Sequence, residues 1–131
     1  MGIDPRDAAP FVNRGSARQA KGDLTGAIDD CTEALRRNPL NALAFTVRGA
    51  ALAGRSDHEG AIKDYTEALR INPRYSEAFY RRGIARHGTG DLDGAIEDCT
   101  KALEVAPPNW PLRKFAEQGL LAAQVAKRYR K

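Results

Sequence analysis

The residues best able to do chemistry in this chain are two histidines and two cysteines, and their spacing matches no catalytic or metal-binding motif. His58 and His87 belong to no HExxH pattern, and Cys31 and Cys99 form no CxxC pair. We expect structural or solvated roles for the histidines, and free, buried and inert thiols for the cysteines. The sequence therefore predicts no catalytic residues, no metal and no cofactor, and a protein that is not an enzyme.

Composition and charge favour an ordinary globular domain. The chain has 131 residues, of which 42% are hydrophobic and 29% charged. Its net charge of +4 comes entirely from the basic tail, Lys127, Arg128, Arg130 and Lys131, so we expect no nucleic acid partner. We also expect no membrane contact and a cytoplasmic location, because there is no long apolar run and no signal peptide. Residues 1–7 show no periodic pattern and are expected to be a disordered leader.

The sequence repeats along the chain, so the secondary-structure elements that would position any functional site repeat with it. The period is 34 residues, as the differences 49 − 15 and 83 − 49 between three glycines show. The residues that keep this step are Gly15, Gly49 and Gly83, Ala27, Ala61 and Ala95, Ala34, Ala68 and Ala102, and Pro39, Pro73 and Pro107. A period of this size indicates a stacked array of supersecondary units.

Each period reads as two helices joined by a tight turn. In the first copy, Gly22 ends one helix and Asp23 caps the next, which stops before Pro39 because a residue preceding proline avoids the helical region. Gly49 and its counterparts fall inside helices, where glycine costs about 1 kcal/mol against alanine. Close approach of the partner helix is expected to offset that cost.

With this pattern the chain resembles tetratricopeptide repeat proteins. Their small residues and proline fall on Gly49, Ala61, Ala68 and Pro73, and the aromatic position falls on Phe45. The resemblance implies an all-α fold, a right-handed α-solenoid of three helix-turn-helix units with a seventh, capping helix. The implied units are 8–41, 42–75 and 76–109, followed by a capping helix and basic tail at 110–131.

Arginine stands where most family members carry leucine, which is a departure from the family pattern. These residues are Arg14, Arg48 and Arg82. We expect them to form a ladder of ion pairs with acidic residues of the following helix, namely Asp30, Asp64 and Asp98.

The resemblance also implies a concave groove lined by the first helix of each unit. The residues expected there are Val12, Asn13, Ser16, Leu43, Thr46, Val47, Ala50, Tyr80, Arg81, Ile84 and His87. An exposed apolar patch with a polar rim is usually an interaction site, and a helical groove suits a peptide. The predicted function is a non-catalytic scaffold that binds a partner peptide or protein segment. Alternatively, Val12 and Ile84 pack beneath neighbouring helices.

One subtype of these proteins binds the C-terminal tails of chaperones through a set of basic and amide side chains. The equivalent residues here are Val12, Ser16, Val47, Glu77 and Arg81, of which only the arginine matches. The sequence therefore predicts against chaperone C-terminal tails as partners.

Two other functions remain open from the sequence. Leu121, Ala122 and Val125 widen the apolar arc of the last helix beyond what a simple cap needs, which favours self-association into a homo-oligomer. The chain could equally be the repeat module of a larger enzyme. The identity of the partner does not follow from the sequence.

Overall fold

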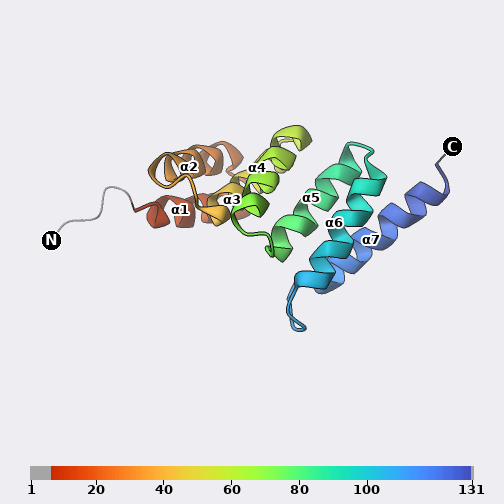
Figure 1. Ribbon diagram of the computed structural model, residues 1–131. Coiled ribbons are helices and arrows are strands. Elements are labelled where there is room, and N and C mark those ends of the chain that lie inside the picture. The colour runs from red at the N-terminus through yellow and green to blue at the C-terminus, as the bar shows by residue number, and fades with distance from the viewer. Residues whose placement is uncertain (1–6, 131) are drawn as a thin grey trace.

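The structure is a computed structural model that describes residues 7–130, so most of the expected leader lies outside the described residues. These residues form seven helices and no strand. The helices are α1 (Ala9–Ala20), α2 (Leu24–Arg37), α3 (Ala42–Gly54), α4 (His58–Ile71), α5 (Ser76–Gly88), α6 (Leu92–Val105) and α7 (Arg113–Arg128). They follow one another along an elongated array with α1 and α7 at its opposite ends (Figure 1). The all-α solenoid expected from the sequence is confirmed.

The odd-numbered and the even-numbered helices form two layers that differ in the contacts within each layer. Each helix packs against the next, and the odd-numbered helices also contact one another along the array: α1 with α3, α3 with α5, and α5 with α7. Within residues 7–130, the even-numbered helices make no such contacts among themselves. The array therefore curves, with the odd-numbered helices on its inner, concave side.

The second helix of each repeat begins at an aspartate N-cap. The side chains of Asp23, Asp57 and Asp91 each accept a hydrogen bond from the backbone N–H three residues later, at 3.0, 2.9 and 2.9 Å. Two of the three turns before these caps have glycine with positive φ, at +87° for Gly22 and +86° for Gly90. The caps predicted from the sequence are confirmed.

The expected ladder of arginine and aspartate is present in all three repeats. Arg48 donates to the two carboxylate oxygens of Asp64 at 2.8 and 2.9 Å, and the Arg14–Asp30 and Arg82–Asp98 pairs are also bidentate. The three carboxylates are buried, with 2–5% of their surface exposed. Each guanidinium also lies over a phenylalanine ring one helical turn earlier, 5.7–5.8 Å from its centre. Paired in this way, a buried charge is tolerated.

The first pair of the ladder, Arg14 with Asp30, makes stability depend on pH. The hydrogen bond from Arg14 lowers the pKa of Asp30 despite the opposing effect of burial. Because the folded-state pKa lies below the unfolded value of about 3.9, this contribution is present above about pH 4 and is lost as the pH falls through the folded pKa. We expect Asp30→Asn to be less stable at neutral pH and to lose less stability on acidification, as urea unfolding at a series of pH values would show.

The neighbouring Asp29 provides the control for that experiment, because it is exposed on the same helix. Asp29→Asn is expected to keep the acid dependence of the natural chain. An equal acid slope in the Asp30 and Asp29 variants would contradict the role given to the ladder.

The last helix begins later than expected and covers the end of the array. Trp110 lies before α7, with its ring edge-on to Tyr80 at 6.3 Å between centroids, and the helix begins only at Arg113. Ala116 and Ala123 are fully buried against the preceding helices. Its large apolar side chains face outward instead: Phe115, Leu121, Val125 and, beyond the helix, Tyr129 are 39–75% exposed.

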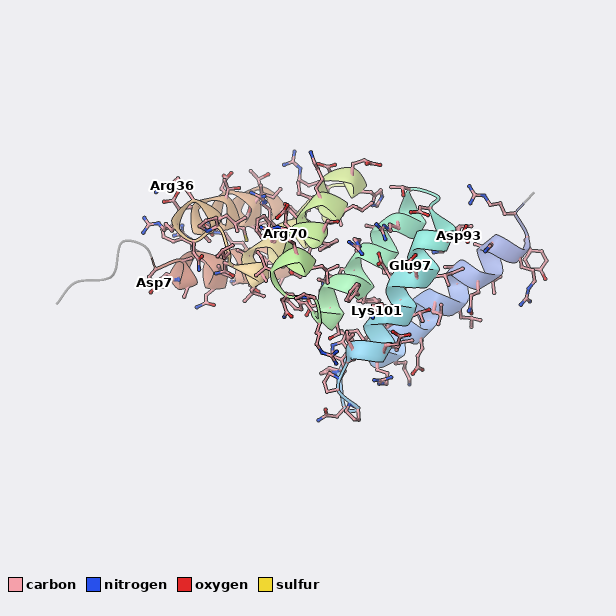
Figure 2. All side chains as sticks on the ribbon, viewed as in Figure 1. Asp7, Arg36, Arg70, Asp93, Glu97 and Lys101 are labelled. Atoms are coloured by element: carbon pink, nitrogen blue, oxygen red, sulfur yellow. The ribbon has the colours of Figure 1, made fainter. Side chains whose placement is uncertain are left out.

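The outer helices carry mainly charged side chains. Figure 2 shows Arg36 on α2, Arg70 on α4, and Asp93, Glu97 and Lys101 along α6. None of the helices within residues 7–130 is long and apolar enough to cross a membrane.

Candidate groove on the inner helices

Two adjoining cavities mark the inner side of the array. The first has a volume of about 200 Å³ and lies among α1, α3 and α5. It is lined by the expected residues Ser16, Leu43, Thr46, Val47, Ala50 and Arg81, together with Gln19 and Glu77. Side chains from three successive repeats thus meet there.

The second cavity, which we call the α3–α5 pocket, has a volume of about 220 Å³. Its lining comprises the expected residues Ala50, Tyr80, Arg81 and Ile84, joined by Ala53, His58, Tyr65 and Ala85. It shares Ala50 and Arg81 with the first cavity, so the two form a continuous depression along α3 and α5. The walls of this pocket are mainly apolar.

The groove carries little net charge, because its cation and its anion neutralise each other. Arg81 Nε donates to Glu77 Oε2 at 2.8 Å, one helical turn away. Burial acts to lower the pKa of Arg81, but the hydrogen bond and charge of Glu77 outweigh it, so the pKa is raised. Arg81 therefore stays charged and paired at the boundary between the two cavities.

Some expected groove residues are placed differently. Val12 is 1% exposed and packs in a core cluster with Ala34 and Leu35, so its side chain does not reach the groove surface. Thr46 is also 1% exposed, and its hydroxyl donates to the carbonyl oxygen of Ala42 at 3.0 Å. Asn13 and His87 line neither cavity. By contrast, Ile84 is 44% exposed and available at the surface.

The pocket residues that sequence reasoning missed include His58 and Tyr65, both of which come from α4. The sequence could have revealed them, because both residues differ in type from those at the same positions of the other two repeats. Where His58 stands, the first and third repeats have Leu24 and Leu92. Where Tyr65 stands, they have cysteine. His58 and Tyr65, which differ from their counterparts in the other repeats, line the same cavity.

The titratable groups near the core are in their unreactive forms. Cys31 and Cys99 are free and buried, and burial raises the pKa of each thiol to about 11. Burial likewise raises the pKa of Tyr65 to about 12. Since the thiolate is the nucleophilic form of cysteine, neither thiol is activated at neutral pH.

Comparison with known proteins identifies similar chains. Models of the tetratricopeptide repeat match residues 12–76 and 76–109. No curated protein sequence matches. The TPR domain of Sgt2 from Aspergillus fumigatus is 29% identical, with a TM-score of 0.86 over 92% of this chain and 79% of that one.

Two similar structures contain peptides. The first TPR of Spaghetti (RPAP3), bound to the HSP90 peptide SRMEEVD, is 26% identical, with a TM-score of 0.86 over 98% of both chains. The second TPR domain of human RPAP3, in complex with the HSP70 peptide SGPTIEEVD, is 31% identical, with a TM-score of 0.83 over 92% of this chain and 98% of that one.

These structures overturn the expectation that excluded chaperone C-terminal tails as partners. Similar domains of the same fold hold HSP90 and HSP70 peptides, so the expected exclusion does not stand. In this chain Val12 is a core residue, and Glu77 is paired with Arg81.

Proposed function

Since this chain belongs to the tetratricopeptide repeat family, we propose that it is a non-catalytic scaffold that binds a short segment of a partner protein in its concave groove. The observation that carries this proposal is the continuous depression along α3 and α5, which is formed by residues of successive repeats. An apolar groove bordered by a few polar groups is the usual form of a peptide site.

Apolar contacts would supply most of the binding free energy. Leu43 and Ile84 line one cavity each and are 48% and 44% exposed, so both offer apolar surface to a ligand. Val47, Ala50 and Tyr80 would complete this apolar strip. Burying such surface stabilises a complex by about 25 cal/mol per Å² before the cost of association is subtracted.

The polar groups around the strip would orient the segment. The Arg81–Glu77 pair offers both donors and acceptors at the junction of the two cavities. Ser16 contributes a hydroxyl to the first cavity. Asn13 and His87, which lie outside both cavities, would contact only a segment that extends beyond them.

The groove can be tested with an array of short peptides that includes SRMEEVD and SGPTIEEVD. We expect a subset of peptides to bind the natural chain, and Leu43→Glu with Ile84→Glu to weaken their binding about tenfold or more. The physical reason is that two charges replace exposed apolar contacts. Fluorescence anisotropy with the labelled binders measures the loss.

A matched control introduces the same two charges outside the groove. Leu40 and Leu121 are 62% and 60% exposed and line neither cavity. Leu40→Glu with Leu121→Glu is therefore expected to bind the same peptides as the natural chain does. An array without binders, or equal losses in the two double variants, would contradict the groove assignment.

Self-association through α7 is a second candidate, favoured by one observation. Phe115, Leu121 and Val125 leave a row of apolar side chains exposed at the end of the array. Apolar surface of this kind is a common feature of contacts between protein chains. A strictly monomeric mass by light scattering at high protein concentration would rule this candidate out.

A further inference from the structure

Helix α7 occupies the place that the first helix of a fourth repeat would take. It packs against α6 and also contacts α5, just as α5 packs against α4 and contacts α3. Its two fully buried alanines, Ala116 and Ala123, are seven residues apart (123 − 116), and α3 and α5 bury alanines with the same spacing. Those alanines are Ala44 and Ala51 in α3, and Ala78 and Ala85 in α5. The step from α5 to α7 is 38 residues (116 − 78), which exceeds the sequence period, so the period alone does not reveal this equivalence.

This equivalence places apolar side chains of α7 on the concave side. A shift of 72 residues (116 − 44) relates α7 to α3, where the equivalent residues line the two groove cavities. The equivalent pairs are Phe115 with Leu43, Gly119 with Val47, Ala122 with Ala50, and Val125 with Ala53. Phe115 and Val125 are 54% and 39% exposed. We call Phe115, Gly119, Ala122 and Val125 the α7 strip.

The α7 strip adjoins the α3–α5 pocket. A Cβ placed on Gly119 would lie 3.0 Å from Cδ1 of Ile84 and 4.0 Å from Cε1 of Tyr80, and both of these residues line the pocket. At the equivalent positions α3 and α5 carry larger residues, Val47 and Arg81. Because Gly119 has no side chain, it leaves part of Ile84 open to solvent. The groove therefore continues from α5 onto α7.

One short segment can reach both the groove cavities and the α7 strip. Packed helices lie about 8–10 Å apart, so the two steps from α3 to α5 and from α5 to α7 span about 16–20 Å. An extended chain advances about 3.3 Å per residue, so about five or six residues cover that distance. A single segment also fits cavities of about 200 and 220 Å³, which are too small to hold a second folded copy of this chain.

The charge at this end of the array favours an acidic segment. Residues 8–109 contain 14 basic and 14 acidic residues, whereas residues 110–130 contain five basic residues and one acidic residue. The basic residues are Arg113, Lys114, Lys127, Arg128 and Arg130, of which Lys127 is paired with Asp93, and the acidic residue is Glu117. The excess of positive charge attracts carboxylates over a distance of about one Debye length, roughly 8–10 Å.

We propose that the groove ends on the α7 strip, which receives a leucine-sized apolar side chain of the bound partner segment, with acidic residues on either side of it. The proposal rests on the proposed function in assigning this side chain to the segment that occupies the groove. Contact with Ile84, Phe115 and Val125 buries the apolar side chain, and the basic end of the array attracts its acidic neighbours.

The test uses the acetylated pentapeptide amide EELEE and two relatives: EEAEE, which lacks the large apolar side chain, and QQLQQ, which lacks the charges. Titrations of the natural chain are followed by NMR through the methyl signals of Ile84 and Ala122. We expect EEAEE to bind about fivefold more weakly than EELEE, or more weakly still. QQLQQ should also bind more weakly than EELEE, and added salt should weaken the binding of EELEE but not that of QQLQQ.

Two double variants locate the contact. Phe115→Gln with Val125→Gln removes exposed apolar surface from the α7 strip and should weaken the binding of EELEE about fivefold or more. Leu40→Gln with Leu121→Gln removes exposed apolar surface elsewhere and should bind EELEE as the natural chain does. Leu121 is equivalent to Gly49, which faces Tyr65 of the second helix of its repeat. Circular dichroism checks that both double variants keep their helices.

Equal binding of EELEE and either relative, no binding of EELEE, or equal affinities of the two double variants would overturn the proposal. Changes of the same methyl signals with protein concentration alone would also overturn it, because a second copy of the chain would then cover the strip. The peptide array keeps this result separate from the proposed function. If array peptides bind and only the Leu43→Glu, Ile84→Glu variant weakens them, the groove stands and its extension onto α7 fails. If EELEE binds the strip while no array peptide binds, the scaffold function fails and the strip remains a binding site.

Discussion

Replacement of Asp98 by alanine is expected to lower the free energy of unfolding by about 3 kcal/mol. The carboxylate is 2% exposed and accepts hydrogen bonds from Arg82 at two atoms, at 2.9 and 2.9 Å, and from Arg86 at 2.9 Å. Without it, two guanidinium groups that are only 14% and 26% exposed face each other without a counter-charge. Urea unfolding followed by circular dichroism measures the change.

An exposed ion pair at the same helix provides the comparison. Asp93 pairs with Lys127 at 2.6 Å, but its side chain is 77% exposed. Solvent-exposed pairs contribute little, so Asp93→Ala is expected to cost much less than Asp98→Ala. Similar losses in the Asp98 and Asp93 variants would show that burial does not strengthen the ladder. That outcome would show that the arginine–aspartate pairs of the ladder contribute little to the free energy of unfolding.

Gly49→Ala is expected to destabilise the protein by about 2 kcal/mol, although alanine is the better helix former. A Cβ at this position would lie 2.6 Å from Cε1 and 2.9 Å from Cδ1 of Tyr65. That ring is 1% exposed and packs in a core cluster with Ala61 and Ala85, so moving it away from the added Cβ disturbs that cluster. The glycine is required here because the two helices pack too closely for any side chain. The same unfolding measurement applies.

The repeats provide matched controls for this prediction. The Cβ of an alanine at Gly15 would meet Sγ of Cys31 at 3.0 Å, a milder contact than that at Gly49, so Gly15→Ala should cost less than Gly49→Ala. Introducing cysteine at Tyr65, as in the first and third repeats, should relieve the clash. We expect Gly49→Ala to cost less in the Tyr65→Cys background than alone. An equal cost in both backgrounds would mean that the ring is not the cause.

The period predicted a stacked array of helix pairs, and the resemblance to tetratricopeptide repeat proteins added the solenoid with a seventh, capping helix. The helix caps at Asp23, Asp57 and Asp91 and the arginine ladder depend on contacts within or between adjacent helices, which the spacing of residues defines. Such local geometry repeats whenever the sequence repeats. This is why the family, the all-α solenoid and the seven helices of the described chain are confirmed by the structure and by its relatives.

The groove was harder to predict, because lining positions depend on how far each side chain reaches past its neighbours. Val12 occupies a lining position by number, yet its side chain packs in the core with Leu35, and Thr46 at the same position of the second repeat is equally buried. The contribution of His58 comes from the second helix of a repeat, where a rule based on first helices does not look. Comparing the copies for departures from the period would have drawn attention to it.

The arginine ladder also joins one repeat to the next. Beyond its own aspartate, Arg48 donates to the hydroxyl of Thr32 in the preceding repeat at 3.2 Å, and Arg82 donates to Thr66 at the same distance. The nearest-neighbour coupling of a repeat array resides in such contacts. These two arginines therefore tie the melting of one repeat to the loss of hydrogen bonds in the preceding repeat. The consequence is cooperativity: the ladder opposes fraying from the ends and favours unfolding of the three repeats as one unit.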